Sequence, residues 1–509
     1  MKTTFDAGYL IPVFIDEALP GDTKNLKASF FCRMATLATP LMDNLYLDTH
    51  FFSVPVRLVW NNFQKFMGEQ ENPGDSIDYL IPTCTSPDGG YPAQSIYDYL
   101  GIPINVGGLE HNELPLRSCY LIYNEWFRDE NLQDSLVFSK GDNATNGGFQ
   151  LFRRGKRHDY FTSCLPLPQK GDAIEIPLTG DAPVIGNGMS LGITNGSNDF
   201  GLIWASNNAY HLGGSSNGYG LELGGTSPEV SLGSNTQRIG ITTNGAKSGI
   251  IADLSQVNAA TINSLRLAFQ LQRFLERTNR SGSRYIEIIK GMFNCVSPDA
   301  RLQRPEYLGG SSTRFMVNTV EQTSATGAGD TPQGNLSAFA VAGSKIHGFT
   351  KSFVEHCYII GFVSVRADLN YQQGLNRLWS RSTRFDFYWP TLAHLGEQAV
   401  LNKEIYAQGN AEDNDVFGYQ ERWAEYRYMP NMITGKFRST YAQSLDVWHL
   451  AQEFSNLPKL NAEFIVDNPP VDRVIAVQDE PQFLLDAYYK FYDVRPMPTY
   501  SVPGLIDHF

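Results

Sequence analysis

Alternating apolar and polar positions predict strands near the start of the chain. The alternation runs through Asn44–Trp60 (NLYLDTHFFSVPVRLVW), and a shorter apolar run covers Tyr9–Phe14. A period of two is typical of a strand with one buried face. Pro55 predicts an edge strand or a bulge for the longer run, because proline has no N–H to donate to a neighbouring strand.

A nearly continuous apolar run predicts the best buried strand. The segment Phe349–Ala367 (FTKSFVEHCYIIGFVSVRA) is dense in valine, isoleucine, phenylalanine and tyrosine, which is typical of a strand covered on both faces. We expect it at the centre of the main sheet. Apolar residues at helical spacing predict short helices at 61–67, 94–100 and 119–127, which we expect to pack in the core.

One amphipathic helix is predicted between residues 261 and 280. Its apolar residues recur at i, i+1, i+4, i+7 and i+8, which predicts a buried stripe on a helix of about five turns. They are Leu267, Ala268, Leu271, Phe274 and Leu275. Asn279–Gly282 is expected to end the helix. A short β-rich run, Tyr285–Ile289, is expected to follow it.

Four arginines lie on the opposite side of this predicted helix: Arg266, Arg273, Arg277 and Arg280. Such a row can meet an anion, acidic residues of a neighbouring subunit, or water. We expect these arginines to support an interface or the core, with contact to DNA as the alternative.

The composition indicates a large, loop-rich, mostly β protein. The chain has 509 residues, of which 42% are hydrophobic and 18% charged, so it can bury a substantial core. Aromatic residues make up 12%, beside 46 glycines and 27 prolines, which favours many short strands joined by long turns. No linker of biased composition separates domains, and we therefore expect one main domain.

Residues 180–250 differ from the rest. They hold 16 of the 46 glycines and only six charged residues. Loops beyond roughly 15 residues are uncommon unless they are functional or disordered, and we interpret this one as a folded surface insertion. Trp204, Tyr210 and Tyr219 either form a recognition surface or serve as the insertion's own small core.

The net charge of −13 argues against a free-standing nucleic-acid binder. The densest basic run contains Arg153, Arg154, Lys156 and Arg157, flanked by aromatic residues. Basic residues interleaved with rings can hold single-stranded nucleic acid. A solvated or salt-bridged turn is the equally favoured alternative.

Other segments indicate structure rather than chemistry. Arginines and rings alternate from Tyr371 to Trp389, and we expect stacking on rings or pairing with the acidic segment that follows. The proline-containing end, Val494–Phe509, predicts an extended arm laid over a neighbour. The amino terminus does not resemble a signal peptide, and no segment resembles a membrane span. Six scattered cysteines favour buried free thiols in a reducing cytosol and no zinc site.

Short motifs typical of enzymes occur in the chain, but their spacing or the predicted elements around them do not fit a catalytic site. Two G-x-S-x-G matches, at 188–192 and 214–218, lie inside the glycine-rich insertion rather than between a strand and a helix. Gly240–Ser248 has an extra residue where a phosphate loop requires adjacency. The histidines lack metal-ligand spacing. Glu421 and Glu425 have the residue types of a glycosidase pair, but spacing alone is weak support. A β-sandwich glycoside hydrolase or a glycan-binding module is the alternative function.

A series of motifs identifies a family. They are His50–Pro55 (HFFSVP), Ser297–Gly310 (SPDARLQRPEYLGG), Gly348–His356 (GFTKSFVEH), Tyr371–Arg377 (YQQGLNR), Arg381–Pro390 (RSTRFDFYWP), His394–Tyr406 (HLGEQAVLNKEIY) and Tyr500–Phe509. Together they resemble the major capsid protein of the gokushoviruses, a subfamily of the Microviridae, the small tailless single-stranded DNA phages. The resemblance covers nearly the whole chain except the insertion.

The resemblance implies a fold and a role. The fold is an eight-stranded viral jelly roll with long loop insertions and a few helices, formed by residues 1–179 and 251–509. Residues 180–250 would rise as a protrusion at the threefold axes and touch the host. The subunit would build a T=1 icosahedral shell around circular single-stranded DNA and would not be an enzyme.

The resemblance also implies partners and a location. The expected partners are further copies of the chain, the DNA genome, a small basic DNA-packaging protein, internal scaffolding and pilot proteins, and a host surface receptor reached through the insertion. No cofactor and no membrane are expected. The protein would reside in the virion after assembly in the bacterial host cytoplasm.

Overall fold

The computed structural model describes residues 1–174, 261–324 and 333–497, together with short strands at 184–186, 192–194, 199–204, 210–213, 220–221, 240–241 and 250–252. The chain divides into two compact units. Residues 172–274 form the smaller unit, and residues 1–171 with 275–509 form the larger one. The smaller unit contains the predicted insertion and most of the helix that follows it.

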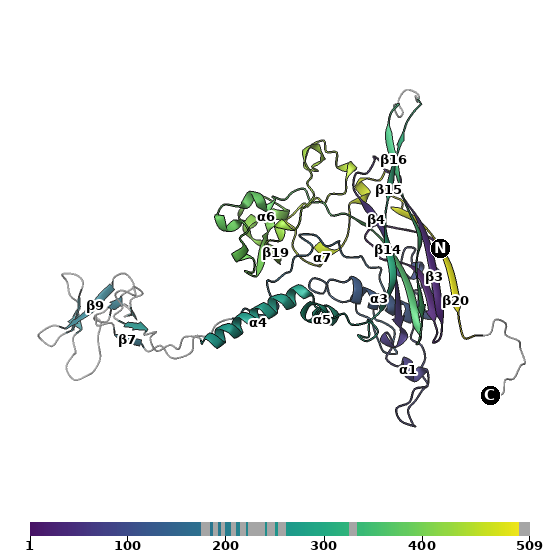
Figure 1. Cartoon of the computed structure of the whole chain (residues 1–509), viewed down its shortest axis with the longest axis horizontal. Coiled ribbons are helices and arrows are strands. Elements are labelled where there is room, and N and C mark those ends of the chain that lie inside the picture. The colour runs from purple at the N-terminus through teal and green to yellow at the C-terminus, as the bar shows by residue number, and fades with distance from the viewer. Residues whose placement is uncertain are drawn as a thin grey trace, which may run out of the picture. The chain divides into compact units, whose positions relative to one another are not determined.

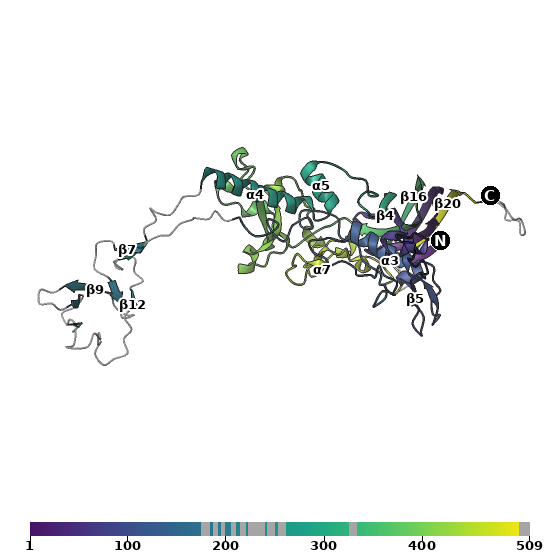
Figure 2. The same ribbon diagram turned by 90° about the horizontal axis from the view of Figure 1, so that it is seen from below.

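The larger unit is mostly β and is built on two antiparallel sheets (Figures 1 and 2). One sheet has five strands in the order β1-β20-β3-β16-β15. Their bounds are Lys2–Phe5, Phe483–Val494, Thr23–Met34, Leu336–Ser352 and Met316–Glu321. Burial alternates along β3, because successive side chains of a strand point to opposite faces.

The second sheet has four strands in the order β14-β4-β17-β2. Their bounds are Glu306–Arg314, Leu45–Pro55, Cys357–Ala367 and Ile11–Ala18. The predicted buried run is divided between β16 and β17. Strand β17 has the predicted interior position and is buried along almost its whole length. The prediction from Pro55 was wrong, because β4 is an interior strand and Pro55 is its last residue, where a missing N–H interrupts no ladder.

The main hydrophobic core lies between the two sheets. Buried side chains from β3, β16 and β20 form one cluster with those of β2, β4 and β17. Aromatic pairs join the sheets, for example Phe14 with Tyr489 at 5.1 Å and Phe51 with Phe349 at 5.9 Å between ring centroids. The two sheets therefore pack face to face as a sandwich, and each fully buried apolar side chain stabilises it by about 1.5–3 kcal/mol.

A second cluster covers the outer face of the four-stranded sheet. It joins Phe52, Tyr358 and Phe362 of that sheet to the buried side of α3. The predicted short helices are confirmed as α1 (Phe63–Phe66), α2 (Ile96–Tyr99) and α3 (Leu114–Ile122), the last continuing into a π turn over Tyr123–Phe127. Because this layer buries its outer face, β17 is apolar on both sides. The hairpin of β5 (Thr83–Thr85) and β6 (Glu110–Asn112) precedes α3.

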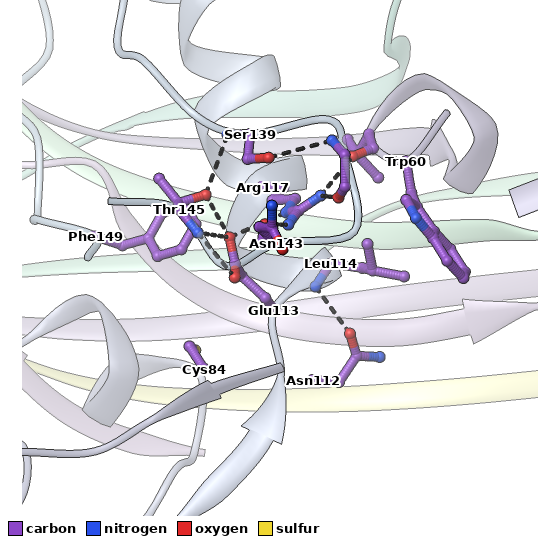
Figure 3. Close-up of polar contacts among 12 residues, drawn as sticks. Trp60, Cys84, Asn112, Glu113, Leu114, Arg117, Ser139, Asn143, Thr145 and Phe149 are labelled. Carbon is purple, nitrogen blue, oxygen red and sulfur yellow. Dashed lines mark hydrogen bonds and ion pairs between the residues drawn. The ribbon is translucent and has the colours of Figure 1, made fainter. Parts of the chain in front are cut away.

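A buried ion pair fixes the chain after α3 (Figure 3). Glu113 and Arg117 are both fully buried, and Arg117 Nε lies 3.0 Å from Glu113 Oε1. The guanidinium also donates to the carbonyl oxygens of Gly141 and Asn143, each at 2.8 Å. Glu113 accepts from the backbone N–H and the hydroxyl of Thr145. Residues 139–145 are therefore held against the helix by charge-assisted hydrogen bonds.

A third, smaller cluster organises the acidic segment. Its regular elements are β18 (Glu397–Leu401), α6 (Asn402–Ile405), β19 (Val416–Glu421) and α7 (Ala462–Ile465). Short 3₁₀ turns connect them, at Arg377–Ser380, Arg384–Asp386, Pro390–Leu392, Ala411–Asn414, Ala424–Tyr426, Gly435–Phe437, Asp446–Trp448 and Val471–Arg473. These long connections explain the high content of glycine and proline.

The predicted amphipathic helix is confirmed as α4, Ile262–Ser281. Within the described residues its apolar stripe is covered only in part, since Leu267 and Leu271 are exposed while Ala268 and Leu275 are half-buried. The predicted β run after it was also wrong, because Tyr285–Phe293 forms helix α5. Glu287 accepts from the backbone N–H of Arg284 at 3.1 Å and so caps the start of α5.

The described part of the smaller unit contains seven short strands. A sheet of order β11-β10-β9-β8-β12 is formed by Gly220–Leu221, Tyr210–Gly213, Asp199–Trp204, Gly192–Thr194 and Gly240–Ile241. A separate pair joins β7 (Val184–Gly186) to β13 (Ile250–Ala252). The insertion thus has β structure of its own, as its short apolar runs predict.

The carboxyl-terminal segment and the cysteines agree in part with the predictions of an extended arm and of buried free thiols. Strand β20 ends at Val494, and Arg495 then pairs with Asp22 at 2.8 Å. The rest of the predicted arm, 498–509, lies outside the described residues. All six cysteines are free, and four are buried, but Cys295 is exposed. Among the described residues, no helix is long and apolar enough to cross a membrane.

Candidate functional site

The basic run at 153–157 lies within the folded chain. The Arg153 guanidinium stacks on Tyr9 at 4.0 Å from the ring centroid and donates to Asn468. Arg154 pairs with Asp48 at 2.9 Å, and burial lowers its pKa to about 10. Both cations are therefore held by partners in the same subunit.

The other two basic residues also have intrachain partners. Lys156 is buried, with its ammonium 4.2 Å from the Phe464 ring centroid and 3.1 Å from Gln452 Oε1. Burial lowers the Lys156 pKa to about 8. Arg157 pairs with Asp368 at 2.9 Å. These contacts agree with the salt-bridged alternative, and a DNA-facing role for the four side chains stays a prediction.

The arginines of α4 divide into two groups. Arg277 donates to the carbonyl oxygen of Gly291, which ties the end of α4 to α5. Arg280 pairs with Glu397 of β18. Arg273 lies about one turn before Arg277 and Arg266 about three turns before it, and both are exposed. The first two therefore support the fold, while the exposed pair stays available to an interface or to DNA.

One cavity of about 1020 Å³ brings members of both basic sets together. Arg154, Lys156 and Arg280 line it, and four further cations come from three other segments: Arg128 after the π turn, Arg284 at the N-cap of α5 with Lys290 of that helix, and Arg366 of β17. Rings of β4, the π turn and β14 line the same cavity. Carboxylates of Asp129, Glu130, Glu287 and Glu421 face it as well. The cavity therefore combines charge of both signs with an aromatic wall.

The floor of this cavity is a buried charge network. Arg154 and Arg366 both donate to Asp48 Oδ2, at 2.9 and 2.6 Å. Burial opposes the charge on Asp48, but the two arginines outweigh it and lower the Asp48 pKa. Burial, reinforced by Arg154, lowers the pKa of His50 to about 3, so its ring is neutral at neutral pH. Within the described residues, Asp48 Oδ1 and His50 Nε2 are buried without a hydrogen-bond partner.

The cavity is suited to binding rather than to a reaction. Burial raises the pKa of the Cys164 thiol on its wall, so no thiolate nucleophile is offered there. Charged and aromatic side chains of this kind can hold a partly anionic segment of a partner. Sequence reasoning missed Arg128, Arg284, Lys290 and Arg366, since they come from three separate segments and no local pattern connects them.

The candidate glycosidase carboxylates are structural. Glu421 is exposed and pairs with Arg427 at 2.6 Å. Glu425 lies 3.9 Å from Arg377 and 3.8 Å from Arg381. Arg377 also pairs with Glu404 at 2.9 Å. The predicted pairing of these arginines with the acidic segment is thus confirmed.

The aromatic residues of the insertion are placed only in part. Trp204 ends β9 and Tyr210 begins β10, and the two residues are Cα partners across the pair. Tyr219 lies outside the described residues. The predicted host-contact role of all three residues stays a prediction.

The larger unit is a β sandwich with long connections, and many of its charged groups pair with one another across the chain. A family model described as capsid protein (F protein) matches residues 1–505, and the chain belongs to that family. It is a structural capsid protein of a small single-stranded DNA phage of the gokushovirus type, is located in the virion, and is not an enzyme.

Three relatives are similar over nearly their whole length. Capsid protein VP1 of Bdellovibrio phage phiMH2K is 49% identical, with 100% of this chain and 94% of the relative covered. Capsid protein VP1 of Chlamydia phage 1 is 45% identical, covering 99% and 94%. Capsid protein VP1 of Spiroplasma virus 4 is 37% identical, covering 98% and 93%.

Proposed function

We propose that this chain is the jelly-roll subunit of a T=1 icosahedral shell that encloses circular single-stranded DNA. The strand order carries the proposal. Setting aside β15, eight strands remain in the two sheets: β1, β2, β3, β4, β14, β16, β17 and β20. Numbered one to eight, they give the orders 1-8-3-6 and 2-7-4-5. These orders support two interlocked Greek keys, the topology of a viral jelly roll.

Exposed apolar side chains support self-association. Trp379 is 73% exposed, Met429 98% and Met432 81%, all on the long connections of the larger unit. Tryptophan and methionine are enriched in the cores of protein interfaces, so these three side chains are candidates for contact with a neighbouring subunit. The apolar side of α4 is a further candidate, because contact with a neighbouring subunit would bury the stripe that the single chain leaves exposed. Repeated axes let modest contacts of this kind add up around a closed ring.

We assign the insertion the role of a threefold protrusion that contacts the host. The separate compact unit at 172–274 supports an element that varies without disturbing the sandwich. Trp204, Tyr210 and Tyr219 are the proposed contact residues. Deleting residues 180–250 is expected to leave particle formation intact and abolish adsorption. Loss of particles would instead assign the insertion to assembly.

The shell needs help to neutralise its genome. A subunit of charge −13 supports a separate small basic packaging protein, beside internal scaffolding and pilot proteins, as partners. Arg266 and Arg273 are the exposed members of the α4 row and are the proposed contacts to DNA or to a neighbour. Reversing both charges separates these roles: loss of assembly supports an interface, and normal but empty shells support DNA.

Electron microscopy of the purified chain, alone and with its phage partners, tests the proposal. Large particles of uniform diameter are expected. A stable monomer under every assembly condition would contradict it.

A further inference from the structure

The outer face of the five-stranded sheet carries exposed rings and cations on two adjacent strands. On β20, Tyr488, Lys490 and Tyr492 alternate with side chains that point towards the core. Lys27 of β3 is the Cα partner of Lys490. Opposite residues of an antiparallel pair project to the same face, so these four side chains share the outer face of the sheet.

Phe31 and Arg33 extend the same face along β3. They lie four and six residues after Lys27, and residues an even number apart on a strand point to the same side. We name the whole group the β3–β20 platform. It consists of Lys27, Phe31, Arg33, Tyr488, Lys490 and Tyr492. Strands β3 and β20 lie side by side in Figure 1 and pair over their full length.

The three cations of this platform have no carboxylate partner within the described chain, although the Lys490 ammonium lies 5.4 Å from the Tyr492 ring centroid. Lys27, Arg33 and Lys490 form no ion pair there, whereas Lys2 and Asp486 on the same sheet are paired at 2.9 Å. Like charges directly opposite each other destabilise a sheet, yet Lys27 and Lys490 are opposite partners. An anionic ligand would relieve this repulsion. Three unpaired cations on one face contrast with the −13 charge of the whole chain.

The rings of the platform are open to a ligand. Tyr488 is 66% exposed, Tyr492 55% and Phe31 53%. On the neighbouring strand β16, the Cα partners of Phe31 and Lys27 are Gly343 and Gly348. Gly343 leaves the space beside Phe31 open, whereas the backbone of Leu26 and Lys27 lies close to the position that a Cβ of Gly348 would occupy. A Cβ at Gly343 would meet nothing within 4 Å.

We propose that the β3–β20 platform binds single-stranded DNA. Lys27, Arg33 and Lys490 contact phosphates, while Tyr488, Tyr492 and Phe31 stack on bases. Alternate residues of a strand are about 7 Å apart, so one cation lies midway between two stacking rings on β20. A duplex hides the faces of its bases, and the platform therefore selects single strands. The inference rests on the proposed function, because a shell around single-stranded DNA needs subunit surfaces that hold it.

Fluorescence anisotropy with a labelled oligodeoxythymidine and the full-length chain tests this proposal. The double variant Lys27→Gln/Lys490→Gln is expected to weaken binding and to make the slope of log affinity against log salt shallower by about 1.4, at about 0.7 for each lost phosphate contact. Tyr488→Ala is expected to weaken binding about 5- to 150-fold, the range for losing one stacked base, with an unchanged slope.

A matched control exists on a loop outside the sheets. Lys436 lies 5.9 Å from the ring centroid of Tyr441, which is also exposed. The variants Lys436→Gln and Tyr441→Ala remove the same groups and are expected to bind DNA like the wild type. Thermal unfolding of every variant identifies any loss of DNA binding that is caused by misfolding. Glutamine removes the charge of lysine but keeps an unbranched polar side chain, so the strands should stay intact.

The outcomes separate this inference from the proposed function. Platform variants that bind the oligonucleotide with wild-type affinity and salt slope would overturn the inference, even if shells form normally. Variants that lose particles yet bind DNA normally would overturn it too, and would make this face a contact between copies. A wild-type chain that never forms particles, but whose DNA binding falls as described in the variants, would leave the inference standing and reject the shell.

Discussion

Replacing Arg117 by methionine tests the buried network behind α3. Glu113 and Arg117 are both fully buried, and removing one partner of such a pair costs about 3–5 kcal/mol because the other charge is left uncompensated. The carbonyl oxygens of Gly141 and Asn143 also lose their donor, at about 1 kcal/mol each. We therefore expect a loss of about 5–7 kcal/mol, concentrated in residues 139–145.

Hydrogen exchange resolves this loss locally. Since 1.4 kcal/mol corresponds to a factor of about ten, amides of residues 139–145 should exchange at least about 100-fold faster in Arg117→Met. The double variant Glu113→Leu/Arg117→Met leaves no lone charge, and should be more stable than Arg117→Met alone. Arg427→Met is the control, because its pair with Glu421 is half exposed and contributes at most about 1 kcal/mol.

The reasoning would be refuted by exchange in residues 139–145 of Arg117→Met that stays within a few-fold of the wild type. It would also be refuted if Arg427→Met destabilised the chain as much as Arg117→Met. Either result would mean that the buried pair does not hold this segment.

Three further predictions follow from burial. Burial raises the pKa of Asp467 to about 6, above that of an unfolded carboxyl, so the folded chain binds this proton more tightly and gains stability as the pH falls from about 7 to 4. Asp467→Asn should remove a rise of about 3 kcal/mol in the free energy of unfolding between those pH values, measured by urea titration; an unchanged rise would assign it to other groups. Phe30→Ala should cost about 3–5 kcal/mol and Phe31→Ala under about 0.5, because Phe30 is buried and its neighbour exposed; equal shifts in unfolding midpoint would contradict the register of β3. Cys295 should react with a maleimide in the native protein, whereas Cys119, buried and with its pKa raised by burial, should react only after unfolding; mass spectrometry of labelled peptides distinguishes the two.

The sequence predicts elements better than it predicts what covers them. Periodicity gave α4 and its apolar side, but periodicity says nothing about whether the covering surface belongs to the same chain. Leu267 and Leu271 are exposed in the single subunit, and the sequence of one chain does not tell which surface covers them. The short apolar run Tyr285–Ile289 fits a strand as well as a helix, so its periodicity alone did not exclude the β structure that we predict for it. The bond from the Arg284 N–H to Glu287, and that from Arg277 to Gly291, favour the helix.

The candidate site was harder to predict than the fold. Arg154 and Lys156 stand in a visible basic run, but their partners Asp48 and Gln452 lie more than 100 residues away. Arg366 reaches the same cavity from β17, inside a run that reads as apolar. The β3–β20 platform combines Lys27 with Lys490, and only the pairing register reveals their proximity. Contacts between distant segments therefore decide where charge accumulates.

The central claim is that this chain builds a closed shell, and particle formation tests it most directly. Sedimentation velocity and negative-stain electron microscopy of the full-length chain, with and without its phage partners, should show one large species of uniform diameter. A persistent monomer in all conditions, or only irregular aggregates, would contradict the account.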